Sequence, residues 1–262
     1  LITIEYTSFV FLLWGPLLPR TSVSLLLCSF HILIAMSLWS LYMSVTTDPG
    51  AVPLYWGFHI GEENKRRRYC KMCNVWKPER THHCSICNRC NLNMDHHCPW
   101  INNCVGFYNR KFFIQLLFYV YATLAVYIVT GSYPLYLHVS EVVMVDIRFL
   151  DAGDVLIVVV YIIALFFIIT LTSFLKFHVT LVIENSTTIE NVERESGDTS
   201  KQEDDSDRAK YDMGRRRNVE QVMGSSTLWW FIPHHNATSR PVGDGVNWFH
   251  ANTQMTSSTK HL

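Results

Sequence analysis

The sequence predicts an all-α polytopic membrane protein with four transmembrane helices and a hydrophilic, cysteine-rich segment between the second helix and the third. Two observations lead to this class. Hydrophobic residues make up 49% of the chain and charged residues only 17%, against about 25% charged residues in ordinary soluble proteins. Seven of the eight cysteines lie between Cys70 and Cys104, and the long apolar runs lie on either side of that segment.

The first two helices are predicted before residue 48. Leu1–Leu18 is apolar but lacks the basic start and the small-residue cleavage site of a secretory signal peptide, so we expect it to be the remaining part of a first transmembrane helix. Because the chain does not begin with Met, we also expect an N-terminal portion to precede it. Ser22–Val45 is uncharged and exceeds the ~20 residues needed to cross a bilayer. Cys28, within it, is expected to be a buried small hydrophobe, or else a lipid-facing thiol.

Two further spans are predicted at Phe112–Leu137 and Val155–Phe174. The intervening His138–Asp154 is acidic and free of cysteine, which fits the lumenal or extracellular side. The insert 51–111 is rich in basic residues and cysteines, which favours the reducing cytosol. Four spans would return both termini to the cytosol. Four tyrosines of the third span are expected either to line an acyl-chain cavity or to pack: Tyr119, Tyr121, Tyr127 and Tyr133.

The tail after residue 178 divides by composition. Glu193–Lys210 has almost no apolar residues and is predicted to be disordered or loop-like. Tyr211–Pro233 regains apolar character and is predicted to form a short amphipathic helix and an interfacial anchor. The predicted parts of the chain are therefore 1–47 (helices 1, truncated, and 2), 48–111 (cysteine-rich domain), 112–178 (helices 3 and 4) and 179–262 (a partly disordered cytosolic tail).

The cysteine pattern predicts two metal sites and one free thiol. Cysteines two residues apart offer two thiolates to one tetrahedral zinc ion. Two closed sites need eight ligands, so seven cysteines require help from histidine. If each site takes three cysteines and one histidine, one cysteine is spared. Cys98 follows Asp95, His96 and His97 directly, and a neighbouring imidazole activates a thiol. The alternative is that all seven cysteines and one histidine are ligands.

The motif at this position resembles a known family. Asp95-His96-His97-Cys98-Pro99-Trp100, followed by Asn102-Asn103-Cys104-Val105-Gly106 and Asn109, is similar to the signature of the DHHC-type protein S-acyltransferases, or palmitoyltransferases. Three further signatures of the family occur in the expected order, so the resemblance covers most of the chain. These signatures are Asp48-Pro49-Gly50, Thr187-Thr188-Ile189-Glu190, and Asn218 with Val222 and Gly224.

The resemblance implies a role for each of these residues. Cys98 would carry the acyl group, His96 would be the base, and Asp95 would orient or polarise it. Two structural Zn²⁺ ions would be bound, the first by Cys70, Cys73, His83 and Cys90 and the second by Cys84, Cys87, His97 and Cys104. Spacing alone leaves His82 and His83 as alternatives, and the family match favours His83. Thr187 and Glu190 would brace the tail against the catalytic loop.

The implied fold is thus a four-helix membrane protein with a cytosolic zinc-binding cysteine-rich domain inserted between helices 2 and 3. The implied function is protein S-palmitoylation: transfer of a long-chain acyl group from acyl-CoA, such as palmitoyl-CoA, through a Cys98 acyl-enzyme to cysteines of membrane-associated proteins. A catalytically silent, membrane-anchored zinc scaffold is the alternative. The zinc module is tethered between membrane spans, so nucleic acid is not an expected partner.

The expected location is the Golgi, the endoplasmic reticulum or the plasma membrane, with the active site in the cytosol. The basic run Lys65–Arg68 is expected to be a patch attracted to phospholipids. A binding site for the phosphates of coenzyme A is the alternative for that run.

Overall fold

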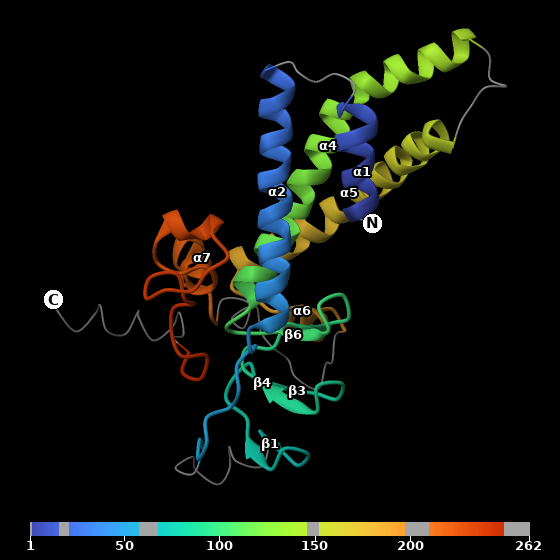
Figure 1. Cartoon of the computed structure of the whole chain (residues 1–262). Helices are drawn as coiled ribbons and strands as arrows, with labels where there is room; N and C mark the ends of the chain where they lie inside the picture. Colours follow the sequence, from blue (N-terminus) through green and yellow to red (C-terminus); the bar gives the residue numbers. More distant parts are fainter. Residues whose placement is uncertain (1, 16–20, 58–67, 146–151, 197–209, 249–262) are drawn as a thin grey trace. The chain divides into compact units, whose positions relative to one another are not determined.

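The computed structural model describes residues 2–15, 21–57, 68–145, 152–196 and 210–248 (Figure 1). The chain divides into two compact units, which are considered separately below. The first comprises Leu1–Leu38 and Leu116–Lys176, and the second comprises Trp39–Gln115 and Phe177–Leu262.

Three helices among the described residues are long and apolar enough to cross a membrane: α2 (Thr21–Thr46), α4 (Arg110–Val145) and α5 (Ala152–Ile183). They correspond to the second, third and fourth predicted spans. The stretch predicted as the first span forms a shorter apolar helix, Thr3–Leu13. It consists of α1 (Ile2–Thr7) and the π-helical segment η1 (Ser8–Leu13). The chain therefore has the apolar helices of a membrane protein.

Helices α4 and α5 are longer than the spans predicted from the sequence. Their apolar runs were bounded at the nearest charged residues, such as Lys111 and Lys176. A helix that leaves the bilayer can continue into the polar region, because its backbone hydrogen bonds are internal and do not depend on the surroundings. The prediction therefore located both helices, but their last residues, Val145 and Ile183, lie beyond the predicted ends at Leu137 and Phe174.

Three aromatic rings lie within the otherwise aliphatic core of the first unit. The rings of Phe9 and Phe30 lie 4.1 Å apart, and that of Tyr127 lies 5.5 Å from Phe9. The Tyr127 hydroxyl hydrogen-bonds the Ser8 Oγ at 3.1 Å. Tyr127 is thus a packed core residue. Cys28 is exposed on α2 rather than buried, because it lies on a different face of the helix from Phe30.

The cysteine-rich segment of the second unit is built of three β-hairpins, so the all-α prediction is wrong for this part of the chain. Each hairpin is a separate two-stranded antiparallel sheet. Their strands are β1 (Tyr69–Cys70) with β2 (Val75–Trp76), β3 (His82–Cys84) with β4 (Arg89–Asn91), and β5 (His96–Cys98) with β6 (Asn103–Val105). Strands of two or three residues have no detectable hydrophobic period, so the sequence pattern did not reveal them.

The three hairpins repeat one local structure. Each turn contains an asparagine in the left-handed region, at φ 54° for Asn74, 51° for Asn88 and 46° for Asn102. Asparagine tolerates this conformation better than most residues. The register also repeats, since His83 faces Cys90 in the second hairpin and His97 faces Cys104 in the third. Equivalent positions are 14 residues apart along the chain.

The Asp48-Pro49-Gly50 turn joins the end of α2 to these hairpins. The Gly50 N–H donates to Asp48 Oδ1 at 2.7 Å, and Arg89 donates to both carboxylate oxygens of Asp48 at 2.8 Å. The Asn103 amide donates to carbonyls in the last turn of α2 and just beyond it, those of Ser44, Val45 and Thr47. These contacts cap α2 and fix the second and third hairpins to its end.

The tail contributes α6 (Thr188–Glu195), α7 (Arg215–Met223) and the 3₁₀ segment η5 (Thr227–Phe231). Helix α7 and η5 occupy the stretch predicted as an amphipathic helix. Most of the predicted loop Glu193–Lys210 lies outside the described residues, and its first residues belong to α6. Asn218 is fully buried and donates to the Ile183 carbonyl at 2.7 Å, which holds α7 against the end of α5.

Two glycines at the ends of α7 provide a matched test of this packing. Gly214 and Gly224 have nearly the same φ, 90° and 89°. A Cβ at Gly224 would lie 2.6 Å from backbone atoms of residues 238 and 239, whereas a Cβ at Gly214 would meet nothing within 4 Å.

We expect Gly214→Ala to cost about 1–3 kcal/mol through backbone strain. Gly224→Ala should cost a further ~1–3 kcal/mol, because the new methyl group has no room. Thermal unfolding of the purified protein in detergent measures the difference. Equal midpoints for the two variants would contradict the close approach at Gly224.

Candidate active site and metal centres

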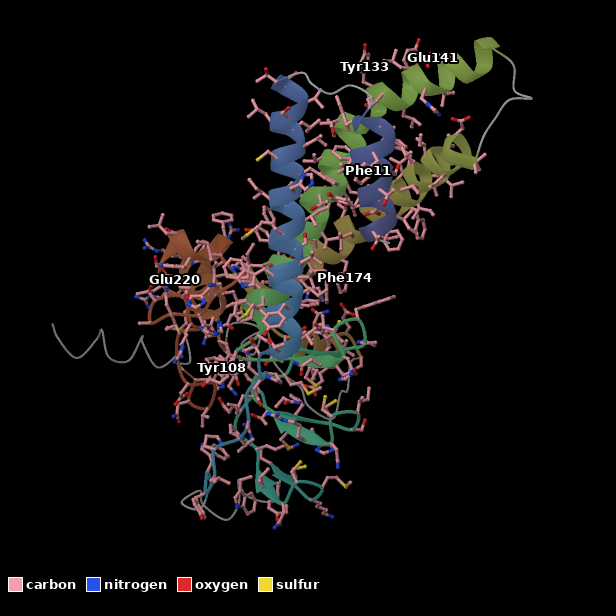
Figure 2. The ribbon with its side chains drawn as sticks, viewed as in Figure 1. Phe11, Tyr108, Tyr133, Glu141, Phe174 and Glu220 are labelled. Carbon is pink, nitrogen blue, oxygen red and sulfur yellow. The ribbon has the colours of Figure 1, made fainter. Side chains whose placement is uncertain are left out.

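The described residues contain two groups of cysteine and histidine side chains, each with four ligand atoms within 4.8 Å of one another. Figure 2 shows sulfur atoms, in yellow, gathered along the hairpins. The first group comprises Cys70, Cys73, His83 and Cys90, and the second comprises Cys84, Cys87, His97 and Cys104. These are the two ligand sets that the family resemblance implied, and His82 belongs to neither.

The spacing of these atoms fits zinc. Zn–S bonds of about 2.3 Å and Zn–N bonds of about 2.0 Å in a tetrahedron place ligand atoms roughly 3.5–3.8 Å apart. His97 Nδ1 lies 3.4 Å from the sulfur of Cys87 and 3.7 Å from that of Cys104, and these two sulfurs are 3.6 Å apart. In the first group, His83 Nδ1 lies 3.1 Å from Cys73 Sγ. Both groups are therefore compatible with zinc.

Each group combines ligands from two successive hairpins. One hairpin contributes the two cysteines of its turn, and the next contributes the histidine and cysteine that face each other across its strands. The second hairpin supplies both groups. A metal ion at either position would therefore join neighbouring hairpins.

Cys98 lies outside both groups, at the end of β5, and is buried with 4% of its surface exposed. Its thiol interacts with the imidazole of His96. The other side of that ring donates from Nδ1 to Asp95 Oδ2 at 2.7 Å. Asp95, His96 and Cys98 thus form an acid–histidine–thiol chain of the kind used in nucleophilic catalysis.

The electrostatics of this chain favour a charged pair. Burial by itself lowers the pKa of His96, but the hydrogen bonds with Asp95 and Cys98 outweigh it and raise that pKa to about 9. Burial likewise raises the pKa of Cys98, yet contacts with His96 and with backbone amides of the turn leave it below its usual value. Cys98 and His96 therefore each stabilise the charged form of the other.

Asp95 is completely buried, and its carboxylate is held by residues far away in sequence. The Thr188 N–H donates to Asp95 Oδ1 at 3.0 Å, and the Thr188 hydroxyl donates to Oδ2 at 2.7 Å. Thr188 is the first residue of α6, so the positive end of that helix also faces the carboxylate. Thr187 and Glu190 form the capping box that begins α6.

Two charged or polar residues near Asp95 were not predicted. Arg110 Nη2 lies 3.3 Å from Asp95 Oδ1 and donates to the Ser186 carbonyl at 2.7 Å. Burial alone would raise the pKa of Asp95, but the Arg110 charge and the His96 hydrogen bond hold it well below its usual range. His178 lies 3.9 Å from Asp95, and its ring centre is 5.5 Å from that of His96. In the sequence, Arg110 and His178 each stand at the edge of a long apolar run, and that position could have marked them as candidates.

Arg80 is a third residue that sequence reasoning missed. It is buried, and it donates to Glu190 from Nε at 2.7 Å and from Nη2 at 2.9 Å. Its guanidinium lies 4.4 Å from the ring centres of both Tyr211 and Trp248. The Arg80 carbonyl accepts from the N–H of Met94, directly before Asp95. Arg80 therefore connects α6 and the tail to Met94, the residue directly before Asp95.

The structure thus brings together only some of the site residues that the sequence predicted. Thr188 hydrogen-bonds the Asp95 carboxylate of the Asp95–His96–Cys98 chain. Glu190 caps α6 and accepts hydrogen bonds from Arg80. Asp48-Pro49-Gly50 and Asn218 lie elsewhere in the second unit and hold helix ends in place.

Comparisons with known proteins agree with this geometry. Residues 63–195 match the family model described as DHHC palmitoyltransferase. The chain is 34% identical over 256 residues to probable protein S-acyltransferase 13 of Arabidopsis thaliana, covering 89% of this chain and 81% of that protein. It is 32% identical over 259 residues to probable protein S-acyltransferase 14 of the same plant, covering 88% and 80%.

A shorter match joins the chain to a fungal protein. It is 39% identical over 187 residues to palmitoyltransferase PFA3 of Debaryomyces hansenii, covering 66% of this chain and 45% of that protein. The fold and site are those of a membrane protein with a histidine-paired thiol beside two metal-ligand clusters. The chain belongs to the DHHC palmitoyltransferase family, which confirms the resemblance found in the sequence.

The adjacent histidines His82 and His83 test the ligand assignment. His83→Ala removes a nitrogen ligand and should release at least one of two zinc ions per chain, because a structural site rarely survives the loss of a ligand. His82→Ala leaves both groups complete and should retain two. Elemental analysis of the purified variants measures the zinc content. Loss of zinc in the His82 variant alone would reverse the assignment.

Proposed function

We propose that this chain is a protein S-acyltransferase that moves a long-chain fatty acyl group from acyl-CoA to cysteine thiols of membrane-associated proteins. The observation that carries the proposal is the position of Cys98. Its thiol is excluded from both metal-ligand groups and paired with a histidine whose far side is fixed by a buried aspartate. A purely structural zinc module has no use for that arrangement.

In the first step, the Cys98 thiolate attacks the carbonyl carbon of the acyl-CoA thioester. The bond between that carbon and the sulfur of coenzyme A breaks, and the leaving thiolate takes the proton held by the His96 imidazolium. The products are acyl-Cys98 and coenzyme A as its thiol. One thioester replaces another, so no further source of free energy is required.

In the second step, a cysteine thiol of the protein substrate gives its proton to neutral His96. The resulting thiolate attacks the acyl-Cys98 carbonyl carbon, and Cys98 leaves as a thiolate. The charged pair is thereby restored. A positioned base of this kind typically contributes about 10²–10⁴-fold to the rate. Asp95 keeps Nδ1 of His96 occupied, so that Nε2 faces the sulfur.

The two cysteine–histidine groups would each hold one Zn²⁺ ion with a structural role. Zinc supplies folding free energy to segments too small to build a hydrophobic core. The first ion would be held by Cys70, Cys73, His83 and Cys90, and the second by Cys84, Cys87, His97 and Cys104. In this proposal neither ion touches the substrate, and both act by fixing the hairpin that carries Cys98.

We place the cysteine-rich segment on the cytosolic face, between the second and third of four spans. Its basic and cysteine-rich composition supports this orientation. The apolar helix Thr3–Leu13 would be part of the first span. The Golgi, the endoplasmic reticulum and the plasma membrane are the proposed compartments. Lys65–Arg67 of the basic run lie outside the described residues.

Acyl-enzyme formation tests the nucleophile directly. The full chain, purified in detergent, should incorporate label from alkyne-tagged palmitoyl-CoA, and neutral hydroxylamine should remove it because the bond is a thioester. Cys98→Ser should abolish the label while the protein still holds two zinc ions. Label that persists in this variant would move the chemistry to another thiol, such as the exposed Cys28.

Thr188→Val tests the support of Asp95. The substitution keeps the shape and the backbone N–H but removes the hydroxyl that donates to Asp95. Loss of one hydrogen bond to a buried carboxylate costs about 1–3 kcal/mol. Single-turnover acylation of Cys98 should therefore slow by roughly 10–100-fold.

The matched control is Thr180→Val, at an exposed threonine near the end of α5. It should acylate at the wild-type rate. A Thr188→Val enzyme that reacts as fast as this control would show that Asp95 needs no help from α6.

A further inference from the structure

Helix α7 begins with three arginines that the proposed reaction does not use. Arg215, Arg216 and Arg217 form its first turn, which contains no acidic residue. All three arginines are exposed. Positive charge at the start of a helix opposes the helix dipole, so these residues do not stabilise α7. An exposed basic turn of this kind indicates an anionic partner outside the helix.

Two carboxylates near this turn compensate its charge only in part. Asp212 Oδ1 accepts hydrogen bonds from the Gly214 N–H at 2.8 Å and from the Asn218 amide at 2.6 Å, so it shapes the start of the helix. Glu220 accepts from Arg216 Nε at 2.8 Å, but 85% of the Arg216 side chain is exposed. Exposed ion pairs of this kind contribute little stability. Three arginines against two carboxylates leave the turn with a net positive charge.

Helix α7 is fixed at the point where α5 ends. The Asn218 amide donates to the carbonyl of Ile183, the last residue of α5. Val222 and Met223, which are buried, pack with Val182 of α5. Because α5 is long and apolar enough to cross a membrane, its end marks the level at which the hydrocarbon gives way to phospholipid headgroups. The basic turn is therefore held at the membrane surface.

The 3₁₀ segment η5 is fixed at the same level. Its Trp230 carbonyl accepts from Gln115 Nε2 of α4 at 2.9 Å, and Ile114 of α4 packs against the same buried cluster. Leu228 and Phe231 of η5 have 82% and 59% of their surface exposed. Exposed apolar side chains together with exposed arginines are typical of segments that lie in the interface of a membrane.

We propose that the surface formed by α7 and η5 is a binding site for anionic phospholipids. The arginines contact the charged headgroups, and Leu228 and Phe231 enter the edge of the hydrocarbon. On the cytosolic orientation proposed above, this surface meets the leaflet that is rich in anionic lipids. The lipid site goes beyond the proposed function and does not depend on acyl transfer.

The phosphates of coenzyme A would attract the same arginines, because they resemble a phospholipid headgroup in charge and in hydrogen-bond acceptors. The exposed residues of η5 favour the lipid. Leu228 and Phe231 match the acyl chains of a bilayer, whereas the polar part of coenzyme A offers them no apolar surface of that kind.

The first test measures lipid contact without an acyl donor. The full chain is reconstituted in phosphatidylcholine nanodiscs that contain a small fraction of a photoactivatable lipid, either phosphatidylserine or phosphatidylcholine. Labelled peptides are then quantified by mass spectrometry. We expect the phosphatidylserine probe to label residues 210–233 in preference to the phosphatidylcholine probe. That preference should fall at high salt, because salt screens exposed charges.

The second test uses paired substitutions. Arg215→Gln with Arg216→Gln should reduce the preference by at least about fivefold, since each basic residue near an anionic surface contributes roughly that factor. Leu228→Ser should weaken labelling by both probes. The matched control, Lys71→Gln with Lys77→Gln, removes two charges from the first hairpin and should keep the wild-type preference. Thermal unfolding checks that each variant is folded.

Equal labelling of residues 210–233 by the two probes in the wild-type chain, or an unchanged preference in the arginine variant, would overturn the lipid site. If that variant kept its preference but needed more palmitoyl-CoA for half-maximal acylation of Cys98, the arginines would belong to a coenzyme A site instead. A wild-type chain that prefers phosphatidylserine yet forms no acyl-enzyme would contradict only the proposed function.

Discussion

The second unit depends on one buried charge, the carboxylate of Asp95. An ionised carboxylate without exposure is stable only when it is paired and hydrogen-bonded. Its partners come from three segments: His96 from the third hairpin, Arg110 from the start of α4 and Thr188 from the start of α6. These segments must therefore assemble together, because a partial assembly leaves a charge without compensation. The same carboxylate orients the proposed base, so folding and catalytic geometry share one requirement.

The hairpins show how a segment with little apolar core can still position a thiol. Their strands are two or three residues long, too short for independent stability. The ligand sets interleave from one hairpin to the next, so metal bound at the second group, as proposed, would hold β5 in place. A nucleophile on a rigid element is held more precisely than one on a free loop. On this proposal, loss of metal from the second group would also displace Cys98.

Much of the candidate site could be predicted from the sequence, because ligands of one metal lie at short, regular spacings. The spacing and the family resemblance together indicated the triad and both ligand groups. The contact between Thr188 and Asp95 joins residues 93 apart, and no local pattern encodes it. Arg80, Arg110 and His178 were missed because each looked like an ordinary polar residue at the edge of another feature. The 14-residue repeat of the hairpins was visible in the sequence and could have predicted both the turns and the exceptional position of Cys98.

The contacts of Arg80 with the rings of Tyr211 and Trp248 have a consequence for the order of synthesis. Cys98 leaves the ribosome long before Thr188, and Trp248 follows later still. A nascent chain that ends after Arg110 and before Thr188 carries the thiol and both ligand groups, but it lacks the two hydrogen bonds that Thr188 donates to Asp95. The Asp95 carboxylate is therefore only partly compensated until the start of α6 has been made. Trp248 adds the second ring beside Arg80, so the full set of contacts around the candidate active site can form only after residue 248 has been made.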